Sequence, residues 1–370
     1  MEHQYTIANA DQLITPALVY YKEIITANTE KAIRLAGGAQ RLWPHVKSHK
    51  MSEMVKLQMQ LGISRFKCAT IAEAEMLADC GAPNILLAYP LVGPNIQRFL
   101  TLEKSYPALR FWAIGDDYAQ LKQLAEMSDA AGIETHVLID MNLGMNRTGV
   151  PMDQAERLYA SCALLKGIKL CGFHCYDGNH NDPNIELRLQ SVAKAAQTIA
   201  GIKKSLSYKN IVCPIFVMGG TPSFPCHAQY PDVYLSPGTA FITDHGYFSG
   251  LRDLNFVPGA AVLTRVISHP AEGLFTLDLG YKGIASDPAG ARGVIIGMEN
   301  AQPLFQSEEH WVFRMREDCG EAIPEIGTLL YVIPTHICPT SALYPSVQVV
   351  ENGQIVDCWE VTARNRKLTI

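Results

Sequence analysis

The stretch His45-Val46-Lys47-Ser48-His49-Lys50 ends an apolar strand-like segment that begins at Arg41. Two lysines and two histidines at the end of a strand place an amine where burial and neighbouring charges can shift its pKa. A lysine that loses its proton near neutral pH can form a Schiff base with an aldehyde. Taken alone, the stretch also fits a solvated basic turn, so its interpretation depends on the rest of the chain.

Apolar strand-like runs alternate with amphipathic helical windows from Leu42 to about Thr239. Strands that are apolar throughout are typical of a parallel sheet covered by helices. The predicted strands are Leu42–Val46, Arg65–Ala69, Asn84–Ala88, Leu109–Gly115, Glu134–Ile139, Ile168–His174, Ile211–Met218 and Val233–Leu235. Eight such units predict an α/β fold of the (β/α)8 TIM-barrel type. An open doubly wound sheet is less favoured, because its first turn is usually rich in glycine and this one is basic.

Two of the helical windows are Thr70–Cys80 and Tyr118–Ala131. In the first, Thr70 is a suitable N-cap and Glu73 follows three residues later. This spacing predicts a capping box at the start of the helix.

The pattern of residue types along the chain changes after about Tyr247. Short segments rich in β-branched and aromatic residues follow one another, and Glu351-Asn352-Gly353-Gln354 carries an Asn-Gly hairpin signal. These segments are Ala260–Ser268, Leu274–Asp278, Trp311–Arg314, Thr328–Val332, Ser346–Val350 and Gln354–Glu360. We therefore expect an N-terminal strand within residues 1–20 that joins a C-terminal all-β domain (248–370), and a barrel formed by residues 21–247.

The overall composition limits which classes of binding partner and which cellular compartment fit this chain. The chain has 370 residues, of which 48% are hydrophobic and 18% charged, and a net charge of −5. This balance argues against nucleic acid or an anionic membrane as the main partner. No apolar run reaches the roughly 18 residues of a membrane helix, and the N-terminus shows no secretory signal. Ten cysteines without CxxC pairs indicate reduced thiols and a cytoplasmic protein.

The active site of such a barrel lies at the carboxyl ends of its strands. Gly219-Gly220-Thr221 follows the seventh predicted strand and Gly238-Thr239 follows the eighth. These pairs of glycine and hydroxyl residues fit a phosphate cradle, although Gly-Gly-Thr alone is more often a turn. Arg147 is a second anion partner at this rim, or else part of a salt bridge there. With Lys47, these features indicate a phosphorylated aldehyde cofactor, and pyridoxal phosphate fits.

Several segments resemble the fold-type III pyridoxal-phosphate enzymes, and among them the group of D-threonine aldolase and D-serine dehydratase. They lie along nearly the whole chain, at residues 15–19, 44–50, 144–149, 219–222, 236–239 and 336–340. The resemblance implies an alanine racemase-like barrel with a β-domain, usually a homodimer, that acts on D-amino acids with a β-hydroxyl group.

The resemblance also implies roles for single residues. Lys47 is the Schiff-base lysine and Lys50 a nearby cation, although their roles could be exchanged. Arg147 binds the phenolic oxygen of the cofactor, and Tyr176 lies near its pyridine ring. The phosphate loop is formed by Gly219, Gly220 and Thr221 and completed by Gly238 and Thr239.

His336 and Cys338 are two residues apart in an apolar segment, and in an extended segment both would point to the same face. Imidazole and thiolate suit zinc, but a lone His-x-Cys is usually accidental. In the resembling family, this motif binds a divalent metal beside the cofactor. Related aldolases often have aspartate in place of Cys338, whereas the D-serine dehydratases have cysteine. Cysteine therefore favours zinc over manganese and weakens the case for an aldolase.

The resemblance implies a metal-dependent lyase of D-3-hydroxy amino acids, and two reactions compete. In a retro-aldol cleavage, our first choice, a metal-bound base or His49 takes the proton of the β-hydroxyl group. In a β-elimination, Lys47 removes the α-proton and a keto acid and ammonia result. A racemase, a non-catalytic pyridoxal-phosphate-binding protein, and a metal-dependent hydrolase that uses His45 and His49 are further alternatives.

Overall fold

The computed structural model describes residues 4–370, except for the side chain of Cys319. The first three residues of the expected N-terminal segment lie outside this range. The chain divides into two compact units. The barrel unit comprises Lys31–Lys47, Met54–Gly238 and Asn365–Ile370, and the β-unit comprises the residues up to Glu30, Ser48–Glu53 and Thr239–Arg364.

Parallel strands follow one another around the barrel unit in chain order. They are β2 (Arg65–Cys68), β3 (Asn84–Leu87), β4 (Arg110–Gly115), β5 (Thr135–Asn142), β7 (Ile168–Cys175), β8 (Ile215–Met218) and β9 (Tyr234–Leu235). A two-residue strand, β6 (Val150–Pro151), pairs with the end of β5. Six of these seven strands begin within one residue of the prediction, because long apolar runs leave little choice of register. β8 begins at Ile215, four residues later than predicted.

The first predicted strand, residues 42–46, closes the barrel. Leu42 forms a parallel bridge with Leu235 of β9, and His45 forms one with Lys67 of β2. Only isolated bridges appear because Pro44 has no N–H group to donate. Its carbonyl group still accepts a hydrogen bond of 2.7 Å from the N–H of Lys67. The predicted eight-stranded barrel is therefore confirmed.

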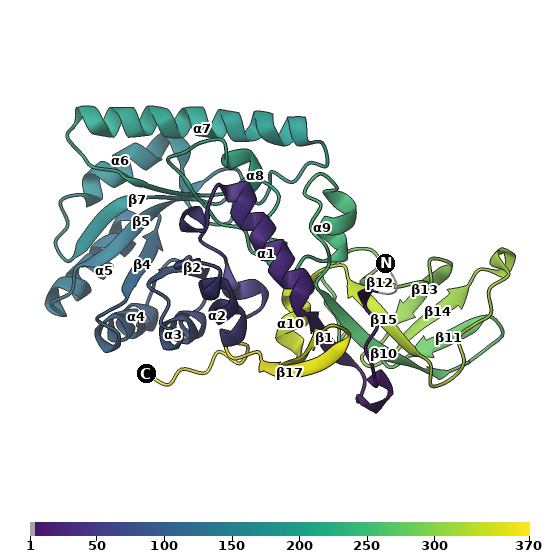
Figure 1. Cartoon of the computed structure of the whole chain (residues 1–370). Coiled ribbons are helices and arrows are strands. Elements are labelled where there is room, and N and C mark those ends of the chain that lie inside the picture. The colour runs from purple at the N-terminus through teal and green to yellow at the C-terminus, as the bar shows by residue number, and fades with distance from the viewer. Residues whose placement is uncertain (1–3) are drawn as a thin grey trace. The chain divides into compact units, whose positions relative to one another are not determined.

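Helices lie on the outer side of these strands (Figure 1). They include α3 (Ile71–Asp79), α4 (Pro94–Ser105), α5 (Tyr118–Ala130), α6 (Met152–Cys162) and α7 (Ile185–Tyr208), with the one-turn helix α8 (Phe224–His227) after β8. Two more helices, α1 (Lys22–Ala36) and α2 (Ser52–Gln60), begin in the β-unit and end in the barrel unit. Both predicted helical windows are confirmed by α3 and α5.

The start of α3 has the predicted caps. The side chain of Thr70 accepts a hydrogen bond of 3.1 Å from the N–H of Glu73. The carboxylate of Glu73 reaches back and accepts a bond of 2.7 Å from the N–H of Ala69. Two N–H groups that the helix leaves without partners are thus satisfied.

The β-unit is a largely antiparallel sheet. Its strands are β1 (Ala17–Tyr21), β10 (Ala260–Ser268), β11 (Leu274–Leu277), β12 (Gly293–Ile295), β13 (Ala301–Gln306), β14 (Trp311–Met315), β15 (Leu329–Pro334), β16 (Ser346–Glu351) and β17 (Gln354–Glu360). The strand order is β13-β14-β11-β10-β1-β16-β17, and β15 pairs with both β10 and β12. Two short helices, α9 (His245–Gly250) and α10 (Ile337–Leu343), belong to the same unit.

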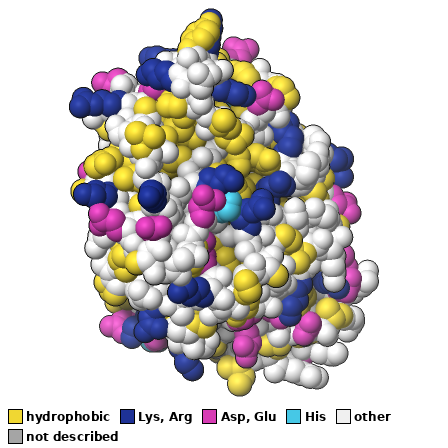
Figure 2. All heavy atoms as spheres, turned by 90° about the vertical axis from the view of Figure 1, so that its left-hand side faces the viewer, with side chains coloured by type: hydrophobic (Ala, Val, Ile, Leu, Met, Phe, Trp, Pro, Cys, Tyr) yellow, Lys and Arg dark blue, Asp and Glu magenta, His cyan; other side chains and the backbone are white. Residues whose placement is uncertain are grey.

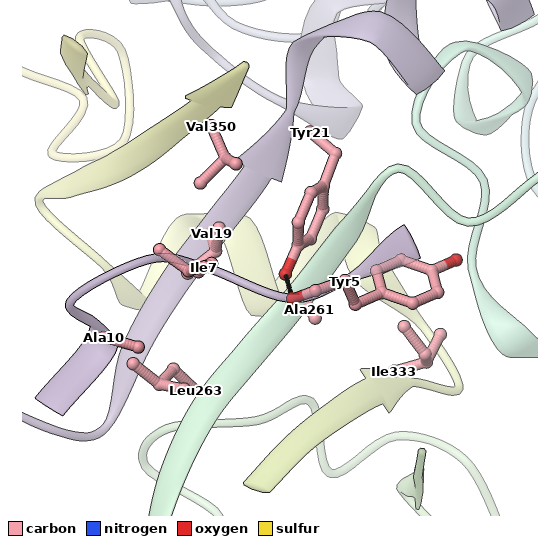
Figure 3. Packing of buried hydrophobic residues seen from close by; sticks show 9 residues of the cluster. All are labelled: Tyr5, Ile7, Ala10, Val19, Tyr21, Ala261, Leu263, Ile333 and Val350. Carbon is pink, nitrogen blue, oxygen red and sulfur yellow. Dashed lines mark hydrogen bonds between the residues drawn. The ribbon is translucent and has the colours of Figure 1, made fainter. Parts of the chain in front are cut away.

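The chain's first strand lies inside this sheet, since β1 pairs antiparallel with β10 and parallel with β16. The residues before it pack on the same core (Figure 3). Tyr5 is buried there, and its carbonyl oxygen accepts a hydrogen bond of 2.8 Å from the hydroxyl group of Tyr21. Ring centroids of these two tyrosines lie 5.0 Å apart in an edge-to-face arrangement.

Three further observations concern the surface charges, the cysteines and the apolar character of the helices. On the face shown in Figure 2, basic and acidic side chains are interspersed, in keeping with the small net charge. None of the cysteines whose side chains are described forms a disulfide bond. No helix in the described range is both long and apolar enough to cross a lipid bilayer.

We predict that Thr70→Ala lowers the free energy of unfolding by about 1 kcal/mol, because it leaves the N–H of Glu73 without its acceptor. Thr70→Ser keeps the hydroxyl group and should retain most of the stability. Urea unfolding of the two variants measures the difference. Equal stability of the alanine and serine variants would contradict the capping role.

Candidate active site

Two of the predicted site residues, Lys47 and Arg147, lie near the aromatic ring of a third, Tyr176. Lys47 lies in the 3-10 turn Val46–Ser48 after the first strand, Arg147 in the loop after β5, and Tyr176 directly after β7. The Lys47 amine is 5.8 Å from the centroid of the Tyr176 ring, and the guanidinium carbon of Arg147 is 5.2 Å from it. These residues are distant in sequence, but the strands before them all end at the same side of the barrel.

A fourth residue, Lys67, was missed by the sequence analysis. It lies on β2, is fully buried, and places its amine 5.3 Å from the same ring centroid. Burial, helped by the positive charges of Lys47 and Arg147, lowers the pKa of Lys67 to about 7, although the negative charges of Asp140 and Asp177 oppose the shift. The only signal in the sequence was a lysine between Phe66 and Cys68 in an otherwise apolar strand.

Asp140 at the end of β5 holds two groups of the barrel rim. One carboxylate oxygen is 2.7 Å from Nδ1 of His174, and the other accepts a hydrogen bond of 2.8 Å from the hydroxyl group of Thr148. The next residue, Gly149, donates its N–H to Asp116 at 2.7 Å. Both contacts fix the loop that carries Arg147. Burial lowers the pKa of His174, so its neutral ring donates Nδ1–H to Asp140.

The predicted phosphate loop lies against the same tyrosine. Gly219 has a left-handed φ of 80°, and a Cβ atom on Gly220 would lie 3.0 Å from a ring carbon of Tyr176. Only glycine therefore fits at position 220 without displacing the ring. The N–H of Gly238 points to the hydroxyl group of Thr221 at 3.3 Å.

A buried network supports this loop from behind. Ser223 accepts a hydrogen bond of 3.1 Å from the N–H of Gly220 and donates one of 2.5 Å to Asp177. The second carboxylate oxygen of Asp177 is 2.7 Å from Nε2 of His227. Burial would raise the pKa of Asp177, but the polar contacts with His180, His227 and Ser223 outweigh it and lower the pKa below its usual range.

These residues fit pyridoxal phosphate. Lys47 supplies the amine, Tyr176 an aromatic face, and Arg147 a cation, while the glycine loop leaves a space that a Cβ atom at position 220 would narrow. Thr239, which was expected to complete the phosphate loop, begins a segment of the β-unit. Its hydroxyl group lies 3.2 Å from Sγ of Cys338.

His336 and Cys338 do not lie in an extended segment, and that premise is wrong. His336 precedes the first residue of α10, and Cys338 lies in the first turn of this helix. Asp244 accepts a hydrogen bond of 3.0 Å from the N–H of Ile337 and so fixes the helix start. Burial raises the pKa of Asp244 to about 6, although these backbone hydrogen bonds oppose the shift.

The two predicted metal ligands nevertheless interact with each other. Burial would lower the pKa of His336, but hydrogen bonding and the negative charges of Cys338 and Asp287 outweigh it and raise the pKa to about 9. Asp287 lies 2.5 Å from Nδ1 of His336. A carboxylate on Nδ1 leaves Nε2 for a metal, which is the usual environment of a metal-binding histidine.

The donor set fits a divalent metal with open coordination positions. In the described part of the chain, no group of three or more histidine, cysteine, aspartate or glutamate residues has metal-binding geometry. Catalytic zinc sites usually have three protein ligands, so a site of one nitrogen and one sulfur ligand would need water or substrate to complete its coordination.

The remaining histidines of the basic stretch face their own backbone. Nδ1 of His49 accepts a hydrogen bond of 3.1 Å from the N–H of Met51, and Nδ1 of His45 accepts one of 3.3 Å from that of Lys47. Burial, with the charge of Lys50, lowers the pKa of His49 to about 3. With Nδ1 occupied, the proton of neutral His49 resides on Nε2, a buried donor for which the described residues provide no acceptor.

A closed barrel with this site and a separate β-sheet defines the class of fold-type III pyridoxal-phosphate enzymes. Residues 22–244 match the family described as alanine racemase, N-terminal domain, and residues 259–350 match the putative serine dehydratase domain. Since the first match spans more than half of the chain, the chain belongs to the alanine racemase N-terminal domain family.

Similar proteins are found over nearly the full length. A D-threonine aldolase from Arthrobacter sp. is 29% identical over 332 residues, which cover 87% of this chain and 85% of the relative. The D-threo-3-hydroxyaspartate dehydratase of Delftia sp. is 25% identical, with 94% and 97% covered. The crystal structure of D-threonine aldolase from Filomicrobium marinum has a TM-score of 0.88 at 28% identity and covers 98% of this chain and 99% of its own. The predicted class, a pyridoxal-phosphate-dependent lyase, is confirmed.

Lys67→Met should stabilise the protein at neutral pH. The folded protein holds Lys67 with a pKa of about 7, whereas the ordinary pKa of a lysine, which applies to the unfolded chain, is 10.5. Because the unfolded chain binds the proton more tightly, the stability of the parent chain rises with pH between these two values. The methionine variant lacks this term, so its advantage, on the order of a few kcal/mol, should be largest below about pH 7 and vanish near pH 10.5. Urea unfolding of the cofactor-free proteins across this range measures it, and an advantage independent of pH would contradict the buried charge.

Proposed function

We propose that this chain is a pyridoxal-phosphate- and divalent-metal-dependent lyase that cleaves the Cα–Cβ bond of D-3-hydroxy amino acids. The observation that carries the proposal is the convergence of Lys47, Arg147 and Gly220 on the ring of Tyr176. Support for the substrate class comes from the names of its relatives, which include a D-threonine aldolase and a D-threo-3-hydroxyaspartate dehydratase.

Different residues at the barrel mouth would bind different chemical groups of the cofactor. Lys47 would bind its aldehyde, the loop 219–221 with Gly238 would hold its phosphate, and Arg147 would face its phenolic oxygen. A guanidinium group there favours the ionised oxygen. When bound, pyridoxal phosphate supplies an electron sink for the bond that breaks at Cα.

The pair of His336 and Cys338 would hold the metal. Asp287 orients the imidazole through Nδ1, and Thr239 contacts the sulfur. A thiolate ligand suits zinc better than manganese. When bound, the metal supplies a Lewis acid for the β-hydroxyl group of the substrate. A racemase would have no use for such a pair.

A dehydratase is the second candidate, and two observations favour it. Cys338 stands where the resembling aldolases often have aspartate, and residues 259–350 match the putative serine dehydratase domain. In that reaction Lys47 would take the α-proton, and hydroxide would leave from Cβ. In the aldol cleavage the hydroxyl proton must leave instead. A metal-bound base would then take that proton. His49 would donate through Nε2 rather than act as the base, because its Nδ1 accepts the N–H of Met51.

Incubation of the holoenzyme with D-threonine and with D-serine distinguishes these reactions. We expect glycine and acetaldehyde from D-threonine, and ammonia with a keto acid would indicate the dehydratase. Lys47→Ala should abolish the absorbance band of the bound cofactor and lower the rate by at least about a thousandfold. Lys50→Ala should keep the band. Neither product from either substrate would contradict the proposed function.

Cys338→Ala should remove the bound metal, as measured by metal analysis of the purified protein. Asp287→Asn should weaken metal binding by about tenfold to a hundredfold, because the imidazole loses its orienting carboxylate. Cys358→Ala removes an exposed cysteine of the same unit and is the matched control. A Cys338→Ala protein that retains a full metal content would remove this site from the proposal.

A further inference from the structure

Two consecutive residues after β7 fix the loop 219–221. The first is Tyr176, and a Cβ atom at Gly220 would lie 3.0 Å from a carbon of its ring. The second is Asp177, which acts on the loop through Ser223. The hydroxyl group of Ser223 donates a hydrogen bond of 2.5 Å to Asp177 and accepts one of 3.1 Å from the N–H of Gly220. The end of one barrel strand therefore determines where this loop lies.

The charge of Asp177 fixes the direction of these hydrogen bonds. Burial opposes the ionisation of Asp177, but its contacts with His180, His227 and Ser223 outweigh burial and keep its pKa below the usual range. An ionised carboxylate can only accept hydrogen bonds. The hydroxyl group of Ser223 must therefore donate to Asp177, which leaves an oxygen lone pair for the N–H of Gly220. For the same reason Nε2 of His227, 2.7 Å from the carboxylate, carries a proton.

Both backbone groups of Gly220 take part in this support. Its N–H donates to Ser223, and its carbonyl oxygen accepts hydrogen bonds of 3.2 Å and 2.9 Å from the N–H groups of Ser223 and Phe224. The peptide bond between Gly220 and Thr221 is trans, so its C=O and N–H groups point in opposite directions. The N–H of Thr221 therefore points away from the start of α8. Gly220 gives the loop its shape, and donors for an anion must come from other residues.

Without this support the loop would have several conformations. Gly219 and Gly220 are consecutive glycines, and Gly219 has a left-handed φ of 80°. Glycine adopts left-handed and right-handed conformations with similar ease, so the peptide between the two residues could turn. Asp177 and Ser223 are fully buried, and a Gly220 N–H group that lost its acceptor there would seek another one. A loop that must first be ordered binds its ligand more weakly.

We infer that Asp177 and Ser223 hold the loop 219–221 in the conformation that accepts a phosphate group, and so make the site select a phosphorylated aldehyde over the same aldehyde without phosphate. The inference rests on the proposed function, because the phosphate is that of the cofactor. The carboxylate oxygens of Asp177 already bind Ser223 and His227. Asp177 acts through Ser223, and Ser223 acts through Gly220, so both are positioning residues.

The test compares how tightly the cofactor-free protein binds pyridoxal phosphate and pyridoxal, each followed by the absorbance of the bound aldehyde. Ser223→Ala removes the acceptor of the Gly220 N–H, so its affinity for pyridoxal phosphate should fall at least about tenfold. Its affinity for pyridoxal should stay within about threefold of that of the parent chain. Ser223→Thr keeps the hydroxyl group and should bind pyridoxal phosphate within about threefold of the parent chain.

Ser128→Ala is the matched control. It also removes a fully buried serine hydroxyl group, which lies 3.1 Å from the hydroxyl group of Thr135 at the start of β5. The start of β5 is the end of the strand opposite the active-site rim. Ser128→Ala should therefore change neither affinity.

A second variant tests whether Asp177 acts through Ser223. In Asp177→Asn, either orientation of the amide turns an NH2 group toward a side chain that donates to the carboxylate in the parent chain. We expect a loss of affinity for pyridoxal phosphate similar to that in Ser223→Ala. The double variant should bind within about threefold of Ser223→Ala, because the two residues belong to one chain of hydrogen bonds. Urea unfolding shows which variants fold, and if Asp177→Asn does not, the Ser223 variants decide the inference.

The outcomes separate the inference from the proposed function. Equal losses of affinity for both aldehydes in folded Ser223→Ala, or no loss for either, would overturn the inference alone. A folded Ser223→Thr that binds as weakly as Ser223→Ala would overturn it too, and additive losses in the double variant would exclude the path through Ser223. Borohydride reduction with peptide mass analysis identifies the lysine that is bound. No capture of pyridoxal phosphate at Lys47 of the parent chain would overturn the proposed function and the inference together.

Discussion

Like charges stay close inside a protein only where the fold holds them in place, and the barrel does so at Tyr176. Lys47, Lys67 and Arg147 come from different strand ends and contact one ring. The nearby carboxylates of Asp140 and Asp177 are occupied by other partners. The mouth of the barrel therefore remains electropositive and suits a negatively charged cofactor. This arrangement positions the loop 219–221, the loop that carries Arg147, and both Lys47 and Lys67. Each of them lies against the ring of Tyr176 or against residues that hold this ring in place.

Much of the fold could be predicted because its signals are local. Apolar runs defined the barrel strands, and the spacing of Thr70 and Glu73 defined the start of α3. Strand β13 was missed because Pro303 interrupts its pattern, and proline is tolerated there since the strand lies at the end of the sheet order. An extended segment at His336 was wrong because Asp244, distant in sequence, anchors the first N–H of α10. Pro339 is compatible with that helix, as it lies in the first turn.

The candidate site likewise contains residues that could be predicted from the sequence and residues that could not. Lys47, Arg147 and Gly220 belong to motifs that are visible in the sequence, and their meeting at Tyr176 required only that parallel strands end together. Lys67 carries no motif, and its importance arises from burial, which a sequence pattern of one lysine among apolar residues does not reveal. Asp287 was missed as well, because its contact with His336 joins two loops far apart in the chain.

The position of β1 in the sheet has a consequence for biosynthesis. This strand leaves the ribosome before the barrel strands, yet its two neighbours are β10 and β16, which are translated after all of them. Its apolar residues must therefore wait, exposed or chaperoned, while the intervening barrel strands emerge, because contacts of long sequence separation form only after both partners exist. Translation that stops before β16 would leave this sheet without a central partner, so truncated chains should be recognised as unfolded by cellular quality control.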